Sequence, residues 1–119
     1  MLSIKMPRGD LRHFKIAIRE GDGSLTDIPF TDIYFTVKRL YRDEEFKFQK
    51  RLSNGTIVKD EDGFYEFSIM PEDTNDLAFG EYAFDIELVD NGSIKQTTVG
   101  RLWLTEEVTY QSNEVNNYG

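Results

Sequence analysis

The sequence contains no cysteine and only one histidine among its 119 residues. Disulfide bonds and thiol catalysis are therefore excluded, and a zinc site is not expected, because cysteine and histidine are the usual zinc ligands. The lack of cysteine fits synthesis in a reducing cytoplasm. The single histidine, His13, shares the outward parity of Lys15 and is interpreted as a surface residue.

Long apolar runs and an excess of basic residues are also missing. No segment reaches the length of a transmembrane helix, and the first ten residues lack a long apolar stretch, so we expect neither a membrane partner nor a signal peptide. Lysine and arginine number 14 against 22 acidic residues, which gives a net charge of −8. This balance argues against nucleic acid as a partner, because phosphate binding needs a basic surface.

No catalytic or cofactor motif is present in the sequence. We find no glycine-rich phosphate loop, no nucleophile elbow and no nucleophile beside an evident base. The acidic turns at 20–24 and 60–63 offer carboxylates for calcium, but neither matches the twelve-residue calcium loop. We therefore predict that the protein is not an enzyme and has no catalytic residues, cofactor or metal site, with calcium at these turns as the open alternative.

Short stretches of alternating apolar and polar residues, separated by turn signals, run through most of the chain. The inward-facing sets are Phe14, Ile16 and Ile18; Ile33, Phe35 and Val37; and Tyr65, Phe67 and Ile69. This pattern predicts an all-β fold, an antiparallel immunoglobulin-like β-sandwich of seven or eight strands with one short helical turn. Residues 1–109 form the predicted domain, and residues 110–119 form a polar C-terminal tail.

The central hairpin is predicted by the pair Asn91-Gly92, which favours a two-residue type I′ turn because both residues tolerate positive φ. This turn pairs Asp90 with Ser93. Continued without interruption, the same register sets Leu88 opposite Lys95.

The uninterrupted register also places Arg101 opposite Tyr82 on the buried face. A buried, unpaired charge is strongly unfavourable. We therefore predict one extra residue, a β-bulge, near Gly100. The bulge brings Leu102 opposite Tyr82 and turns Arg101 outward.

A tyrosine corner is predicted just before this strand. Pro71 begins a helical turn that ends near Leu77, Gly80 starts the strand, and Tyr82 follows two residues later. We expect Tyr82 in the core, with its hydroxyl bonded to the backbone near Asp76 or Leu77.

Trp103 is the candidate anchor of a protein interface. The predicted register points it outward on the strand face shared by Ala83 and Arg101, and tryptophan beside arginine is a combination enriched at interfaces. Tyr34 also has outward parity, on a strand that the sequence does not place relative to Trp103. The alternative is that the segment from Thr105 folds back and covers Trp103.

Two further local predictions concern the middle of the chain. Asn54-Gly55 and Asp62-Gly63 are both read as hairpin turns, and the second sets Lys59 opposite Glu66. A basic cluster is interpreted as a solvated sheet edge, and its members are Lys38, Arg39, Arg42, Lys47, Lys50 and Arg51.

Several short pieces occur in a recognisable order over roughly residues 3–109. They are Arg8-Gly9-Asp10 before Phe14, Phe35-Thr36-Val37-Lys38, Asp62-Gly63 with Phe67-Ser68-Ile69, Pro71-Glu72-Asp73-Thr74 with Leu77, Gly80 and Tyr82, and Gly100-Arg101-Leu102-Trp103-Leu104 leading to Val108-Thr109. In this order and spacing the chain resembles the immunoglobulin-like module at the N-terminus of tailed-phage and prophage baseplate upper proteins of Gram-positive bacteria.

The resemblance implies a structural, protein-binding role in the virion, at the tail baseplate. In that family the module attaches a longer receptor-binding or scaffolding chain to the baseplate, so the implied partners are other phage tail proteins or further copies of the chain. The sequence departs from the family by ending at Gly119 without that longer part, so receptor binding is not carried over. A bacterial surface or adhesin-type sandwich domain and a small ligand-binding sandwich are the alternatives.

Overall fold

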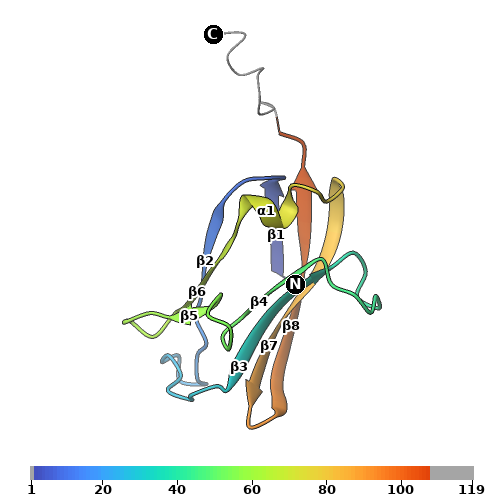
Figure 1. Cartoon of the computed structure of the whole chain (residues 1–119). Helices are drawn as coiled ribbons and strands as arrows, with labels where there is room; N and C mark the ends of the chain where they lie inside the picture. Colours follow the sequence, from blue (N-terminus) through green and yellow to red (C-terminus); the bar gives the residue numbers. More distant parts are fainter. Residues whose placement is uncertain (1, 108–119) are drawn as a thin grey trace.

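Two β-sheets pack face to face in the computed structural model, which describes residues 2–107 (Figure 1). Met1 and residues 108–119, which include the predicted polar tail, lie outside the described residues. The elements are β1 (Leu2–Pro7), β2 (Arg12–Ile16), β3 (Asp32–Lys38), β4 (Phe48–Arg51), β5 (Val58–Lys59), β6 (Tyr65–Ile69), the helical turn α1 (Pro71–Thr74), β7 (Gly80–Asp90) and β8 (Ser93–Thr105).

The five-stranded sheet has the order β1-β8-β7-β3-β4, and the three-stranded sheet has the order β2-β6-β5. This grouping matches that of immunoglobulin domains. There β2, β6 and β5 correspond to strands B, E and D of one sheet, and β3, β7 and β8 correspond to strands C, F and G of the other. The predicted all-β immunoglobulin-like sandwich is therefore confirmed, with eight strands and one helical turn among the described residues. The pairing differs from a fully antiparallel arrangement at one place, because β1 runs parallel to β8.

Aromatic side chains from both sheets form the centre of the core. The ring centroid of Phe35 on β3 lies 4.5 Å from that of Phe67 on β6 and 5.2 Å from that of Phe84 on β7. Ile33, Phe35 and Val37 are fully buried, while Tyr34 between them is only partly covered. The inward-facing sets expected from alternation thus form the contact between the sheets.

The turn between β7 and β8 is the predicted type I′ turn. Asn91 and Gly92 have φ values of +51° and +78°, and Asp90 pairs with Ser93. Both turn residues are in the left-handed region, which matches the twist of the two long strands.

The predicted bulge exists, but its predicted position near Gly100 is wrong. Val89 pairs with Ile94 and Leu88 with Gln96, so the extra residue is Lys95, beside the turn. The predicted pairing of Leu88 with Lys95 is wrong for the same reason. A bulge beside the turn shifts all later residues of β8 by one position, which places Arg101 on the outer face while Gly100 keeps a regular pairing.

The two other turn predictions have different outcomes. Asp62-Gly63 joins β5 to β6 in a hairpin, but Lys59 pairs with Tyr65 rather than with Glu66. Asn54-Gly55 forms a turn with Gly55 at a φ of +82°, yet it connects β4 to a strand of the other sheet. The turn itself is local, whereas the sheet that the next strand joins is decided by packing.

The tyrosine corner is confirmed, with the acceptor one residue later than expected. Tyr82 is 2% exposed, and its hydroxyl donates a hydrogen bond of 2.8 Å to the carbonyl oxygen of Ala78. The helical turn α1 begins at Pro71 as predicted, and the Asp73 carboxylate accepts a hydrogen bond from the Met70 backbone N–H at 2.7 Å. Gly80 begins β7 with a φ of +123°, a conformation that favours glycine.

Candidate functional site

An exposed patch made of Trp103, Arg101 and Tyr41, called the Trp103 patch, lies toward the C-terminal end of β8 on the outer face of the five-stranded sheet. Trp103 is 42% exposed, which confirms its predicted outward direction. Its neighbours across the sheet are Lys5 of β1 and Glu81 of β7. The indole therefore lies in a row between a cation and an anion, in the part of the sheet where β1, β8 and β7 run side by side (Figure 1).

Arg101 lies next to Trp103 on this face and is held from two sides. Its guanidinium Nη1 is 2.9 Å from Glu81 Oε2, and its Cζ lies 5.4 Å from the ring centroid of Tyr41. The Tyr41 hydroxyl donates a hydrogen bond of 2.8 Å to the carbonyl oxygen of Gly100. Arg101 is thus positioned before any partner binds.

Tyr41 is a member of the patch that sequence reasoning missed. It belongs to the loop between β3 and β4, and it lines a small cavity together with Ala83 and Asp85 of β7. Ala83 points to the outer face but is only 1% exposed. The position of this loop over the sheet depends on long-range contacts, and a tyrosine in a highly charged loop gave no local signal of them.

Tyr34 shares the outer face but lies away from Trp103. It is level with Glu87 on β7, six residues along the strand from Glu81, or about 20 Å. Its ring lies 4.6 Å from the Arg51 guanidinium. The structure therefore groups Trp103 and Arg101, and it places the third predicted interface residue in a different part of the sheet.

The alternative in which the following segment covers Trp103 is tested only in part. Thr105–Glu107 leave the indole exposed, and the rest of that segment lies outside the described residues.

Asp32 and Arg51 form a tight ion pair beside Tyr34. The Arg51 guanidinium donates to Asp32 Oδ2 at 2.9 Å, and the backbone N–H groups of Ser53 and Ile33 both donate to Asp32 Oδ1. Burial alone would raise the pKa of Asp32, but these hydrogen bonds outweigh it and lower the pKa from 3.8 to about 2. The pair fixes the end of β3 to the end of β4.

Lys50 corrects the interpretation of the basic cluster as a solvated edge. It is 8% exposed, and its ammonium lies 2.6 Å from Asp73 Oδ2 in α1. The period of two on β4 places Lys50 on the inner face with Phe48, so it needs a buried counter-charge. The sequence did not show that α1 would supply one.

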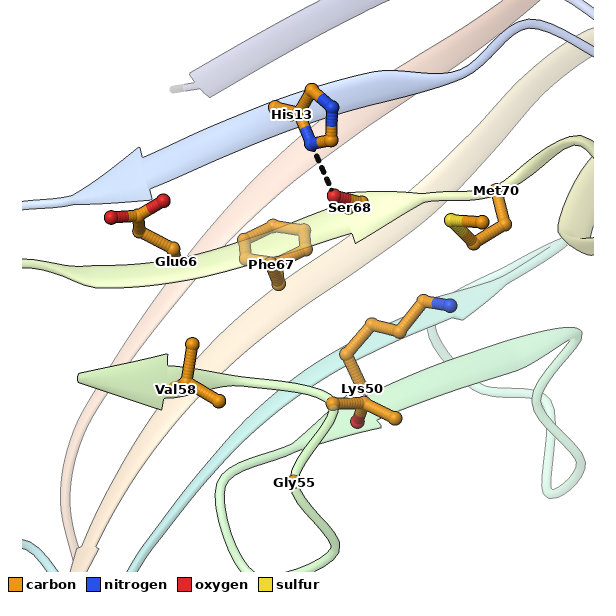
Figure 2. Close-up of a pocket in the computed structure, with 9 residues that line it drawn as sticks. His13, Lys50, Gly55, Val58, Glu66, Phe67, Ser68 and Met70 are labelled. Carbon is orange, nitrogen blue, oxygen red and sulfur yellow. Dashed lines mark hydrogen bonds between the residues drawn. The ribbon is translucent and has the colours of Figure 1, made fainter. Parts of the chain in front are cut away.

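A pocket of about 330 Å³ opens between β6 and the connection from β4 to β5 (Figure 2). Figure 2 shows His13 of β2 and Ser68 of β6 pointing toward one another, and His13 Nδ1 is hydrogen-bonded to Ser68 Oγ. His13 is exposed, as predicted. Within residues 2–107, no carboxylate is hydrogen-bonded to the His13 ring, so the pair lacks a group that would orient it as a catalytic base.

Two carboxyl groups near this pocket share Lys15. The Lys15 ammonium lies 3.7 Å from Asp60 Oδ2 and 4.0 Å from Glu66 Oε2. The neighbouring Glu66 carboxyl group lowers the pKa of Asp60, and the neighbouring Asp60 carboxyl group raises the pKa of Glu66.

In the two acidic turns, at 20–24 and 60–63, aspartate carboxylates accept hydrogen bonds from groups of the same turn. Asp22 Oδ1 accepts hydrogen bonds from the N–H and hydroxyl of Ser24, and Asp60 Oδ1 accepts from the N–H groups of Asp62 and Phe64. Among residues 2–107, no three acidic, histidine or cysteine side chains come together in a way that could hold a metal ion. In the same range, no helix is long and apolar enough to cross a membrane.

A comparison with known proteins finds no family model that matches this chain and no curated protein that is similar to it.

Proposed function

We propose that this protein is a non-enzymatic structural module that binds other proteins in a phage tail baseplate, either neighbouring tail proteins or further copies of itself. The observation that carries the proposal is the exposed Trp103 beside Arg101 on the outer face of the five-stranded sheet. Tryptophan and arginine are the residues most enriched among those that dominate binding energy at interfaces. The order of short motifs along residues 3–109 supports the baseplate assignment.

The patch is well prepared for binding because its polar member is already fixed. Glu81 and Tyr41 hold the Arg101 guanidinium, so little side-chain entropy is lost when a partner covers it. Trp103 supplies the apolar area, and truncation of such an anchor weakens binding by roughly 2 kcal/mol or more.

The test combines association and stability measurements on Trp103→Ala. Sedimentation at several concentrations would measure self-association, and pull-downs with the proteins encoded beside this chain would measure partner binding. We expect Trp103→Ala to weaken one of the two while its thermal melt stays close to that of the wild type. Val58→Ala is the matched control, because Val58 is 51% exposed but lies on the three-stranded sheet.

Two outcomes would contradict the proposal. In the first, the wild-type chain stays monomeric at high concentration and captures none of the neighbouring tail proteins. In the second, Trp103→Ala unfolds the chain, which would assign Trp103 to the core.

A further inference from the structure

Three residues form a row across the outer face of the five-stranded sheet. Lys5 of β1 pairs with Trp103 of β8, and Trp103 pairs with Glu81 of β7. β8 lies between the other two strands (Figure 1). Because directly paired residues point to the same face, the row has a cation at one end, the indole at its centre and an anion at the other end.

The two charged ends of this row are too far apart to neutralise each other within one molecule. Neighbouring strands lie about 4.8 Å apart, so the backbones at Lys5 and Glu81 are separated by about 10 Å, with Trp103 between them. Lys5 is exposed, and none of the ion pairs formed within residues 2–107 includes it. Glu81 is paired with Arg101, yet its side chain is still 37% exposed. Both ends of the row are therefore accessible to charges on another molecule.

A second copy of the chain presents the complementary row. A two-fold axis that runs along β8, between two sheets packed face to face, reverses the row from end to end. Lys5 of each copy then lies over Glu81 of the other copy, and the two Trp103 side chains meet at the axis. An axis at right angles to β8 would place Lys5 against Lys5 and Glu81 against Glu81. Charge complementarity therefore favours the axis along β8.

Arg101 also lies close to this axis, so the two copies bring their guanidinium groups near each other. Glu81 holds Nη1 of each arginine at 2.9 Å, and the Tyr41 ring lies 5.4 Å from Cζ. Each arginine thus enters the contact with its counter-ion already in place, which limits the repulsion between the two.

We propose that the Trp103 patch binds a second copy of this chain in a two-fold dimer whose β8 strands run parallel. Trp103 packs against Trp103 of the second copy, and Lys5 of each copy pairs with Glu81 of the other. The inference rests on the proposed function and names which of its two kinds of partner occupies the patch. The indoles supply the apolar contact, and the two ion pairs fix the orientation.

The experiment is sedimentation of the full chain at several concentrations, with variants studied alone and in mixtures. Lys5→Glu brings two glutamates together at each of the two ion-pair positions, and Glu81→Lys brings two lysines together. Each variant alone should associate at least about tenfold more weakly than the wild type. An equimolar mixture of the two should regain association, because both contacts in the mixed dimer again join opposite charges. Trp103→Ala should weaken association in every combination.

A matched control separates this contact from the general repulsion between acidic molecules, since the chain carries a net charge of −8. Lys95→Glu makes the same change of charge at an exposed position of β8 outside the row, and it should associate like the wild type. Thermal melts of each variant check that the fold is retained. Glu81→Gln keeps an oxygen that can accept from Arg101, and its mixture with Lys5→Glu should still associate more tightly than Lys5→Glu alone.

Three outcomes would overturn the inference. If the wild type stays monomeric but captures neighbouring tail proteins, the proposed function stands and the patch belongs to a different protein. If Lys5→Glu associates more tightly with the wild type than with Glu81→Lys, Lys5 lies opposite Lys5 and the axis is wrong. If the wild type neither associates nor captures a neighbour, the proposed function fails as well.

Discussion

The ring of Phe84 on β7 occupies the space above Gly100 on β8. A Cβ atom at position 100 would collide with this ring and would lie 2.8 Å from the carbonyl oxygen of Leu2 on β1. Glycine therefore allows three neighbouring strands to meet around a buried phenylalanine. This is the physical reason for Gly100, and it replaces the bulge that the sequence suggested there.

Gly100→Ala should lower the free energy of unfolding by about 1–3 kcal/mol, because the added methyl group overpacks the core. Urea denaturation followed by fluorescence would measure the change. Gly21→Ala is the control, since a Cβ at position 21 meets no atom within 4 Å. If the Phe84 ring is the obstacle, Phe84→Leu should recover part of the loss in the double variant, and strictly additive losses would show that it is not.

Tyr82→Phe should lower the free energy of unfolding by about 1 kcal/mol, because the partly buried hydrogen bond from the Tyr82 hydroxyl to the Ala78 carbonyl oxygen is lost. Thermal and urea melts would both report this change. Tyr34→Phe is the control, since the Tyr34 hydroxyl lies in a partly exposed environment and accepts from Arg51 at 3.2 Å. Equal losses of unfolding free energy in the two variants would mean that the hydrogen bond from Tyr82 to Ala78 contributes no more than the exposed one at Tyr34.

Lys50→Met should destabilise the protein by about 3 kcal/mol, because it leaves Asp73 without its buried counter-charge. Asp73→Asn retains an oxygen that can accept from the Met70 N–H, so the double variant should lose less than the sum of the single losses. Urea denaturation of the wild type, the two single variants and the double variant gives the free energies of unfolding for this double-mutant cycle. Additive losses would contradict a direct interaction between the two side chains.

Acid should weaken the pair between Asp32 and Arg51. The folded-state pKa of Asp32, about 2, lies below its ordinary value of 3.8, so its stabilisation is fully present above pH 3.8 and is lost as the pH falls toward 2. We expect the free energy of unfolding to fall by about 1 kcal/mol over this pH range. The loss is small because solvent reaches the partly exposed Arg51 and screens the ion pair.

Asp32→Asn isolates this contribution from the other carboxyl groups. Burial raises the pKa values of Asp85 and Glu87, and these groups therefore shift stability with pH in the opposite direction. The difference between wild type and Asp32→Asn, measured by urea denaturation between pH 2 and pH 6, should shrink as the pH falls. A constant difference over this range would show that the pair does not titrate as described.

Local signals in the sequence predicted most of the strand faces and the central turn. Alternation placed Ile33, Phe35 and Val37 in the core, and the φ preferences of Asn91-Gly92 gave the type I′ turn. These features depend on neighbours along the chain, so a single sequence contains them.

Contacts between distant segments were not predictable in the same way. A bulge near Gly100 was predicted because the uninterrupted register would bury Arg101, whereas the structure has the extra residue at Lys95 and needs Gly100 for the packing of Phe84. Tyr41 joined the Trp103 patch through a loop whose path depends on the assembled sheet. Lys50 met its counter-charge in α1, twenty-three residues later in the chain.

The parallel pairing of β1 with β8 has a mechanical consequence. Six residue pairs join the two strands, from Leu2 with Gly100 to Pro7 with Thr105. Tension between Leu2 and Thr105 pulls the strands along their length in opposite directions, so the hydrogen bonds of the whole ladder are loaded together in shear.

Tension between Gly80 and Thr105 instead separates β7 from β8 one pair at a time, from their open end. In single-molecule pulling, we expect the first attachment to require clearly higher force than the second, and equal forces would contradict this. The pairing of the first and last strands thus makes the described chain a clamp that resists extension along the line between its two ends.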